Sequence, residues 1–96
     1  MRSKEKIIRI LRDVKDDLKK YKVKTIGAFG SVARGEHTAK SDVDVLVDFE
    51  HGADLLDLVG LGFFLERKLG SKVDVISKKA LRKEIKKAVL HDVIPV

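Results

Sequence analysis

The feature that most constrains this chain is a pair of apolar segments, residues 26–29 and 43–47, joined by a glycine-serine turn and a short polar stretch. Both segments are typical of β-strands, and the second begins beside two carboxylates one residue apart. Alternate residues of a strand face the same side. We therefore expect Asp42 and Asp44 to point together into the space near Gly30.

The residue types in this stretch favour a metal and a phosphate as ligands. Adjacent carboxylates repel each other, and a divalent cation compensates the repulsion. Gly30 lets a phosphate approach the backbone closely, and the amides of a glycine turn suit phosphate oxygens. Ser31 offers a hydroxyl donor and Arg34 a fork of N–H donors. From the residues alone, Ser31 can equally cap a tight turn, and Arg34 can equally be an ordinary surface arginine.

A third carboxylate, Asp74, lies between Val73 and Val75 in an apolar segment expected to be a strand. A charged side chain inside an apolar strand is costly unless it is paired or bound to metal. The residues leave a salt bridge and a metal site equally open. Asp48 shares the face of Asp44 if the second strand extends that far, which makes it a weaker fourth candidate.

Taken together, Gly30-Ser31, Ala33-Arg34-Gly35 and Ser41-Asp42-x-Asp44 resemble the signature of the minimal nucleotidyltransferases. These are small members of the DNA polymerase β-like superfamily, and the resemblance covers most of the chain. It implies an α/β polymerase β-like nucleotidyltransferase fold and makes Asp74 the third carboxylate. Asp42, Asp44 and Asp74 would then be both the catalytic residues and the ligands of two Mg²⁺ ions, with Mn²⁺ as the alternative. Gly30, Ser31 and Arg34 would bind the nucleotide.

The same resemblance implies a function and a partner. Transfer of AMP from ATP, or from another nucleoside triphosphate, to a hydroxyl is expected. The acceptor would be a tyrosine of a HEPN toxin, for which this chain would act as the antitoxin. The alternative is a non-catalytic antitoxin that neutralises its toxin by occlusion. An RNA-binding role is the weakest reading, because four Phe and one Tyr provide few stacking platforms; a nucleic acid partner is therefore not expected.

Patterning along the chain predicts three or four strands in a mixed sheet flanked by helices. An amphipathic helix is expected over 4–21 with Ser3 as its N-cap, followed by a strand over 23–29. Residues 31–34 should form one helical turn and 36–40 a polar loop. About a dozen residues separate the first two strands, which is near the minimum for a parallel crossover, so a mixed sheet is expected.

In the second half, we expect a strand over 43–49, a helix over 54–69 closed by Gly70, and a strand over 71–76. Ser77 should cap a last helix that ends near His91. Its inward residues would be Leu81, Ile85, Ala88 and Val89. Residues 94–96 are either an edge strand or frayed.

The helix over 54–69 is more apolar than one buried face requires. Such a surplus indicates an interface, homo- or hetero-oligomeric, and the docking residues expected are Leu58, Leu61 and Phe64. The other reading is a thoroughly buried helix. Gly60 and Gly62 weaken the helix, which close packing can offset.

Composition sets the remaining bounds. The 96 residues are expected to form one domain, 1–96. With no apolar run near the length of a membrane span and no signal peptide, the protein is expected to be cytoplasmic and without a membrane partner. The absence of cysteine excludes disulfides and thiolate metal sites. A net charge of +6 favours anionic partners, or simply a solvated surface rich in salt bridges. His37, His51 and His91 lack metal-ligand spacing and should lie at the surface.

Overall fold

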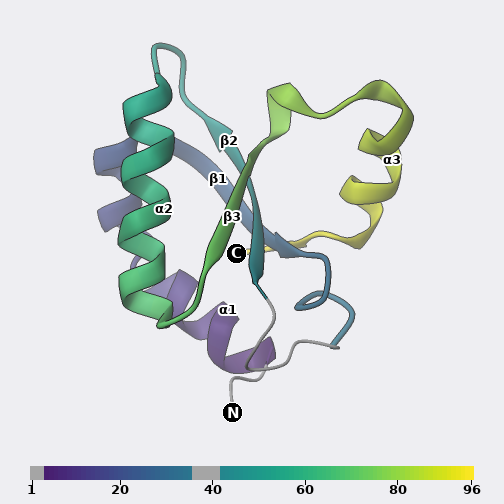
Figure 1. The fold of residues 1–96 in the computed structure, drawn as a ribbon, viewed down its shortest axis with the longest axis horizontal. Coiled ribbons are helices and arrows are strands. Elements are labelled where there is room, and N and C mark those ends of the chain that lie inside the picture. Colours follow the sequence, from purple (N-terminus) through teal and green to yellow (C-terminus); the bar gives the residue numbers. More distant parts are fainter. Residues whose placement is uncertain (1–3, 36–41) are drawn as a thin grey trace.

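The fold is a mixed four-stranded sheet with helices on both faces, seen in a computed structural model that describes residues 4–35 and 42–96 (Figure 1). Strand order is β3-β2-β1-β4; β1 runs antiparallel to β2 and β4, and β2 runs parallel to β3. The expected α/β class and mixed sheet are confirmed. In chain order the elements are α1 (Lys4–Asp13), η1 (Asp17–Tyr21), β1 (Val23–Phe29), β2 (Val43–Phe49), α2 (Leu55–Leu69), β3 (Val73–Ser77), η2 (Lys78–Ala80), α3 (Lys83–Asp92) and β4 (Ile94–Pro95).

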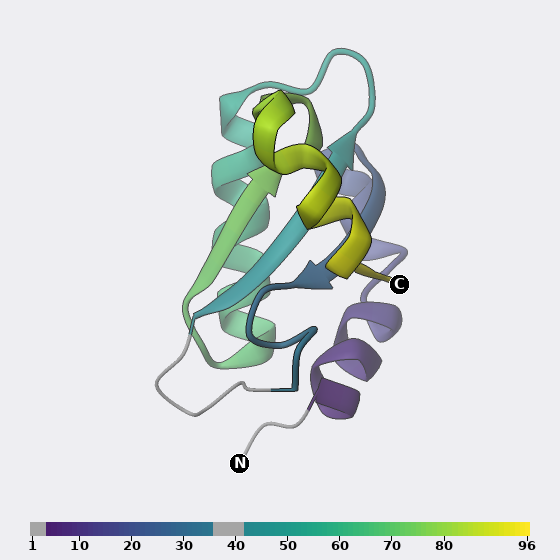
Figure 2. The ribbon, with the colours of Figure 1, turned by 90° about the vertical axis from the view of Figure 1, so that its right-hand side faces the viewer.

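The core lies between the sheet and the layer formed by α1, η1 and α2. Alternation along β2 sends Val43, Val45 and Val47 to this side, and all three are fully buried. They meet an apolar stripe from each helix. The largest fully buried side chains of the helical layer are Ile7, Leu11, Leu18, Leu61, Leu65 and Leu69. Among the elements of the described residues, the helix on the other face of the sheet is α3, which crosses the upper part of that face in Figure 2.

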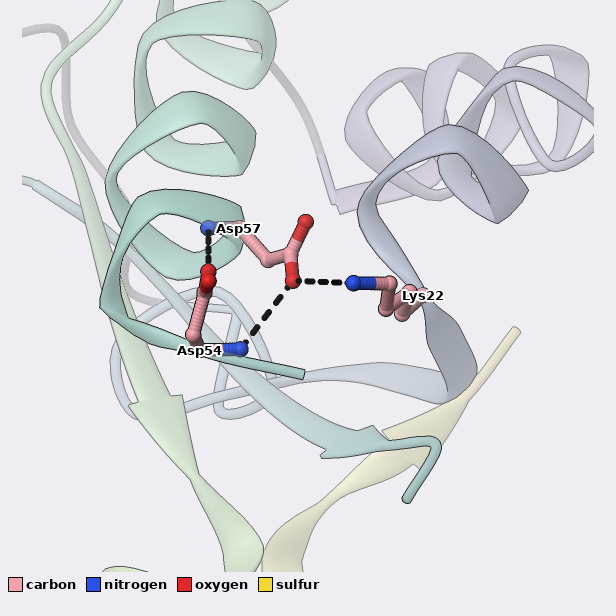
Figure 3. A network of polar contacts seen from close by, with 3 residues as sticks. All are labelled: Lys22, Asp54 and Asp57. Atoms are coloured by element: carbon pink, nitrogen blue, oxygen red, sulfur yellow. Dashed lines mark hydrogen bonds and ion pairs between the residues drawn. The ribbon is translucent and has the colours of Figure 1, made fainter. Parts of the chain in front are cut away.

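The strands β1 and β2 have the predicted bounds, and α2 is confirmed with its caps. Asp54 is the N-cap and forms a capping box with Asp57, and Gly70 ends the helix at φ 67°. Lys22 extends this N-terminal cap: its Nζ lies 3.3 Å from Asp57 Oδ2, which ties the start of β1 to the start of α2 (Figure 3).

The helix predicted over 4–21 is divided in two. The regular helix α1 ends at Asp13, and the chain continues as the 3₁₀ helix η1, which stops at Lys22 in the left-handed region (φ 59°). Asp16 and Asp17 explain the break, because aspartates are poor helix formers and oppose the helix dipole near a C-terminus. The predicted cap Ser3 and the predicted loop over 36–40 lie outside the described residues.

The prediction for the last helix is wrong in its start and its packing. Ser77 makes no capping hydrogen bond and is followed by η2, after which Leu81 and Arg82 are extended and α3 begins at Lys83. That interruption shifts the helical phase, and α3 buries none of its side chains; Ile85 is 50% exposed. The third strand also begins two residues later than predicted, at Val73.

Of the two readings for residues 94–96, the edge strand is the one found. β4 pairs with β1, and Val96 N–H donates to Ile26 O at 3.0 Å. Pro95 suits an edge because it lacks a backbone donor. No helix in the described part of the chain is long and apolar enough to cross a membrane.

Candidate functional site

A row of side chains crosses three strands on the face of the sheet away from α2. Phe29 of β1 pairs with Asp44 of β2, and Asp44 pairs with Asp74 of β3. Register partners on neighbouring strands project to the same face, and Val43 and Val45 occupy the opposite, buried face. The sheet therefore brings Asp44 and Asp74 together on the side away from α2. Asp42, exposed just before β2, shares this side by alternation.

The glycine-serine turn lies directly beside this row. Gly30 has φ +68°, and Arg34 N–H donates to Gly30 O at 3.1 Å, which closes one turn that does not continue as a helix. Val32 is fully buried and anchors the turn, whereas Ser31 is half-buried and Arg34 exposed. A Cβ added at Gly30 would collide with the carboxylate of Asp44. This contact places the candidate phosphate turn and the acidic row side by side.

The environment of Asp74 differs from the expectation. β3 is the edge strand of the sheet, and Asp74 is exposed rather than buried among its valine neighbours. Burial therefore supplies no reason for this aspartate to be paired. The reason that remains is positional, since its register places it next to Asp44.

The donor set fits a hard cation such as Mg²⁺. Among the described residues, which include all three aspartates, no three His, Cys, Asp or Glu side chains form a cluster that could hold a metal ion. Mg²⁺ does not require such a cage, because it keeps several waters and is bound by one or two carboxylates together with substrate phosphates. Asp44 and Asp74 can supply those carboxylates, and the adjacent Gly30 turn can hold the phosphates.

Other candidates are placed as follows. Asp48 lies on the same face four residues beyond Asp44, in a cavity under α3 that is also lined by Lys78 and Leu90, away from the acidic row. His51 and His91 are exposed, as predicted, and His37 lies outside the described residues. Phe29 was not included in the sequence analysis among the residues beside the acidic pair. Its position as the last strand residue before the turn could have indicated this, because it lies opposite Asp44 in the antiparallel pair.

The apolar surface predicted on the helix over 54–69 is present, but on different residues. Leu61 and Phe64, two of the expected docking residues, belong to the core, and Leu58 is half-buried. The exposed apolar side chains of α2 are instead Leu55, Leu56, Val59 and Phe63. The helix is thus neither thoroughly buried nor oriented as expected.

A mixed sheet with paired aspartates beside a glycine-serine turn defines the class of nucleotidyl-transferring proteins suggested by the motifs. The model of the nucleotidyltransferase domain family matches residues 7–95. The chain therefore belongs to the nucleotidyltransferase domain family, and its similarity to a minimal nucleotidyltransferase over nearly the whole of both chains makes it a minimal nucleotidyltransferase.

Three relatives illustrate this membership. The protein adenylyltransferase MntA of Thermococcus cleftensis is 44% identical over 93 residues, covering 96% of this chain and 94% of the relative. A solved minimal nucleotidyltransferase superposes with a TM-score of 0.88 at 36% identity, covering 99% of this chain and 97% of the other. A toxin–antitoxin crystal structure with AMP-PNP matches with a TM-score of 0.69 at 26% identity, covering 96% of this chain and 70% of that chain.

Proposed function

We propose that this chain is a Mg²⁺-dependent protein adenylyltransferase that transfers AMP from ATP to a tyrosine hydroxyl of a HEPN toxin, and that it thereby acts as an antitoxin. The observation that carries the proposal is the register pair Asp44 and Asp74 beside the Gly30 turn. Nucleotidyl transfer needs positioning and charge neutralisation more than covalent catalysis by the protein. The Gly30 turn would position the phosphates, and cations held by the aspartates would neutralise their charge.

Each site residue has a defined task. The backbone at Gly30 and the hydroxyl and amide of Ser31 bind the β- and γ-phosphates, and Arg34 at the end of the turn contacts the nucleotide. Asp42, Asp44 and Asp74 would hold the cations, which would neutralise the triphosphate and lower the pKa of the acceptor hydroxyl.

The reaction is an in-line displacement. The acceptor oxygen forms a bond to the α-phosphorus, the bond from that phosphorus to the β-phosphate oxygen breaks, and pyrophosphate leaves with the bonding electrons. Asp74 accepts the hydroxyl proton. Because Asp74 is exposed, it can pass this proton to water.

The comparisons with known proteins support ATP as the nucleotide and a toxin protein as the partner. A relative that is 44% identical is a protein adenylyltransferase, and the 26% identical structure is a toxin–antitoxin assembly with an ATP analogue. The HEPN class of the partner rests on the family resemblance of the sequence motifs.

The test is intact-mass spectrometry of a candidate HEPN protein sought in the neighbouring reading frame, after incubation with the chain, ATP and Mg²⁺. A gain of one or more AMP groups that disappears with Asp44→Asn supports the proposal. A stable complex with no mass gain would instead establish an antitoxin that works by occlusion.

A further inference from the structure

The edge of the sheet at β3 has an open side beside the acidic row. β3 is the last strand in the order β3-β2-β1-β4, so only β2 pairs with it among the described residues. The strand lies alongside α2 (Figure 1). Residues of both elements line a shallow groove between them. We call this the β3–α2 groove; it is lined chiefly by Val59, Gly62, Phe63, Glu66, Asp74 and Val75.

Backbone hydrogen bonds show which groups of β3 face outward. Val43 N–H donates to Lys72 O at 2.8 Å, so Lys72 faces β2. Because the direction alternates along a strand, Val73 and Val75 face the groove. Val73 confirms this, since its N–H donates to Glu66 Oε2 of α2 at 3.1 Å. An edge strand with outward donors and acceptors is a template for another extended chain.

The side chains around the groove favour a peptide over a nucleic acid. Val59 and Phe63 are exposed, Phe63 at 69%, and they form an apolar wall on α2. Both charged residues that line the groove, Glu66 and Asp74, are acidic. Two carboxylates repel phosphates and acidic segments, so the groove suits a neutral or basic segment.

Asp74 connects the groove to the site, because it lines the groove and is also the register partner of Asp44. A strand added outside β3 would continue the row Phe29–Asp44–Asp74 by one position, about 4.8 Å beyond β3. A side chain at that position projects to the same face as Asp74. Its two sequence neighbours project to the opposite face, where Val59 and Phe63 lie.

From this geometry, and resting on the proposed adenylyl transfer, we infer that the acceptor binds as an extended segment paired with the outer edge of β3. Its hydroxyl-bearing residue lies beside Asp74 and is flanked by apolar residues that contact Val59 and Phe63. The nucleotide and the acceptor then reach Asp44 from opposite sides, the phosphates from the Gly30 turn and the hydroxyl from β3. The groove therefore favours an acceptor segment in which a hydroxyl-bearing residue stands between two apolar residues, within a neutral or basic stretch of sequence.

The experiment compares two serine variants of α2. Phe63→Ser removes the groove wall, and Leu56→Ser is the matched control, because Leu56 is also exposed, at 79%, but does not line the groove. With the candidate HEPN protein as acceptor, we expect Phe63→Ser to lower kcat/KM for the acceptor by about tenfold, the scale of one lost aromatic contact. The KM for ATP should not change, and Leu56→Ser should match the parent.

A second measurement reports on the backbone and does not depend on a variant. We expect the Val75 amide to become protected from hydrogen exchange when the HEPN protein binds the parent chain, and to remain unprotected with ATP and Mg²⁺ alone. Equal kcat/KM for Phe63→Ser and the parent, or a Val75 amide that stays unprotected in the complex, overturns the inference while leaving adenylyl transfer intact. A parent chain that transfers no AMP overturns both.

Discussion

Asp44 and Asp74 are register partners across the parallel strands β2 and β3, which places two carboxylates at neighbouring positions on one face of the sheet. Like charges at directly opposed sheet positions repel and destabilise the fold. The interaction between these two carboxylates is therefore repulsive. At the proposed cation site, a bound cation would offset this repulsion, which would link stability to metal binding.

This linkage gives the first prediction. Asp74→Asn should raise the free energy of unfolding without metal by up to about 1 kcal/mol, because it removes one member of the repelling pair. It should also abolish the added stability that Mg²⁺ and ATP give the parent. Urea unfolding with and without Mg²⁺–ATP measures both effects. Unchanged affinity for Mg²⁺–ATP in Asp42→Asn/Asp44→Asn would contradict the cation site altogether.

The second prediction concerns Gly30, for which Gly35 is a natural control. Both glycines have positive φ, +68° and +72°, but an added Cβ meets the Asp44 carboxylate at Gly30 and nothing within 4 Å at Gly35. Alanine at either site should cost about 1–2 kcal/mol of stability from backbone strain. Only Gly30→Ala should also displace Asp44 and lose ATP binding. Calorimetric titration with ATP separates the two variants.

The third prediction concerns Ser31. Unlike Gly30→Ala, Ser31→Ala removes only a hydroxyl and so tests the phosphate contact alone. We expect ATP affinity to fall by about 1 kcal/mol, the scale of one hydrogen bond, with no change in the unfolding midpoint. If both Ser31→Ala and Gly30→Ala bound ATP like the parent, the turn would be structural only.

The glycines of α2 give a paired prediction on stability. A Cβ at Gly62 would lie 3.7 Å from Val75 Cγ2, an ordinary contact, so Gly62→Ala should stabilise the fold by about 0.8–1 kcal/mol through helix propensity. A Cβ at Gly60 would lie 3.0 Å from Tyr21 Cε1, and Tyr21 packs against Phe64 with ring centroids 5.6 Å apart. Gly60→Ala should therefore stabilise the fold less than Gly62→Ala does, or destabilise it. Thermal unfolding of both variants decides the order.

The capping box of α2 predicts a pH dependence. Hydrogen bonding from Asp54 N–H, aided by Lys22, holds the pKa of Asp57 below its ordinary value of 3.8 (Figure 3). A carboxyl with a depressed folded pKa stabilises the fold above its ordinary pKa, and this contribution is lost as pH falls through the folded pKa.

Asp57→Asn should accordingly flatten the acid limb of a plot of unfolding free energy against pH. Lys22→Met is the control and should flatten it less, because the backbone hydrogen bond is the leading cause of the shift. A larger effect from Lys22→Met than from Asp57→Asn would show that the ion pair dominates.

The sequence predicted most reliably what local patterning determines. Alternation around the buried valines of β2 sets that strand and the face of Asp44, and Asp54 and Gly70 delimit α2 through their capping chemistry. The glycine-serine turn followed strand β1 as expected. Local signals were sufficient in all of these places.

What could not be predicted depends on arrangement in three dimensions. Asp74 is exposed because β3 is an edge strand, and strand order is not encoded in the residues around Asp74. Which of Phe63 and Phe64 is buried depends on the rotation of α2 against the sheet, and a helix that is apolar over much of its circumference leaves that rotation undetermined. The extended residues Leu81 and Arg82 likewise shifted the phase of α3.

The packing of α3 has a consequence for how the molecule opens. Because this helix buries none of its side chains fully, its detachment exposes less apolar surface than unfolding of the core does, and it should depend less on denaturant concentration than global unfolding. It is held at both ends by strands, β3 before it and β4 after it, so it can detach without dissolving the sheet. The covering of this face of the sheet is therefore less tightly tied to the core than α2 is, and sequence change in α3 can alter that covering at less expense to stability than change in α2.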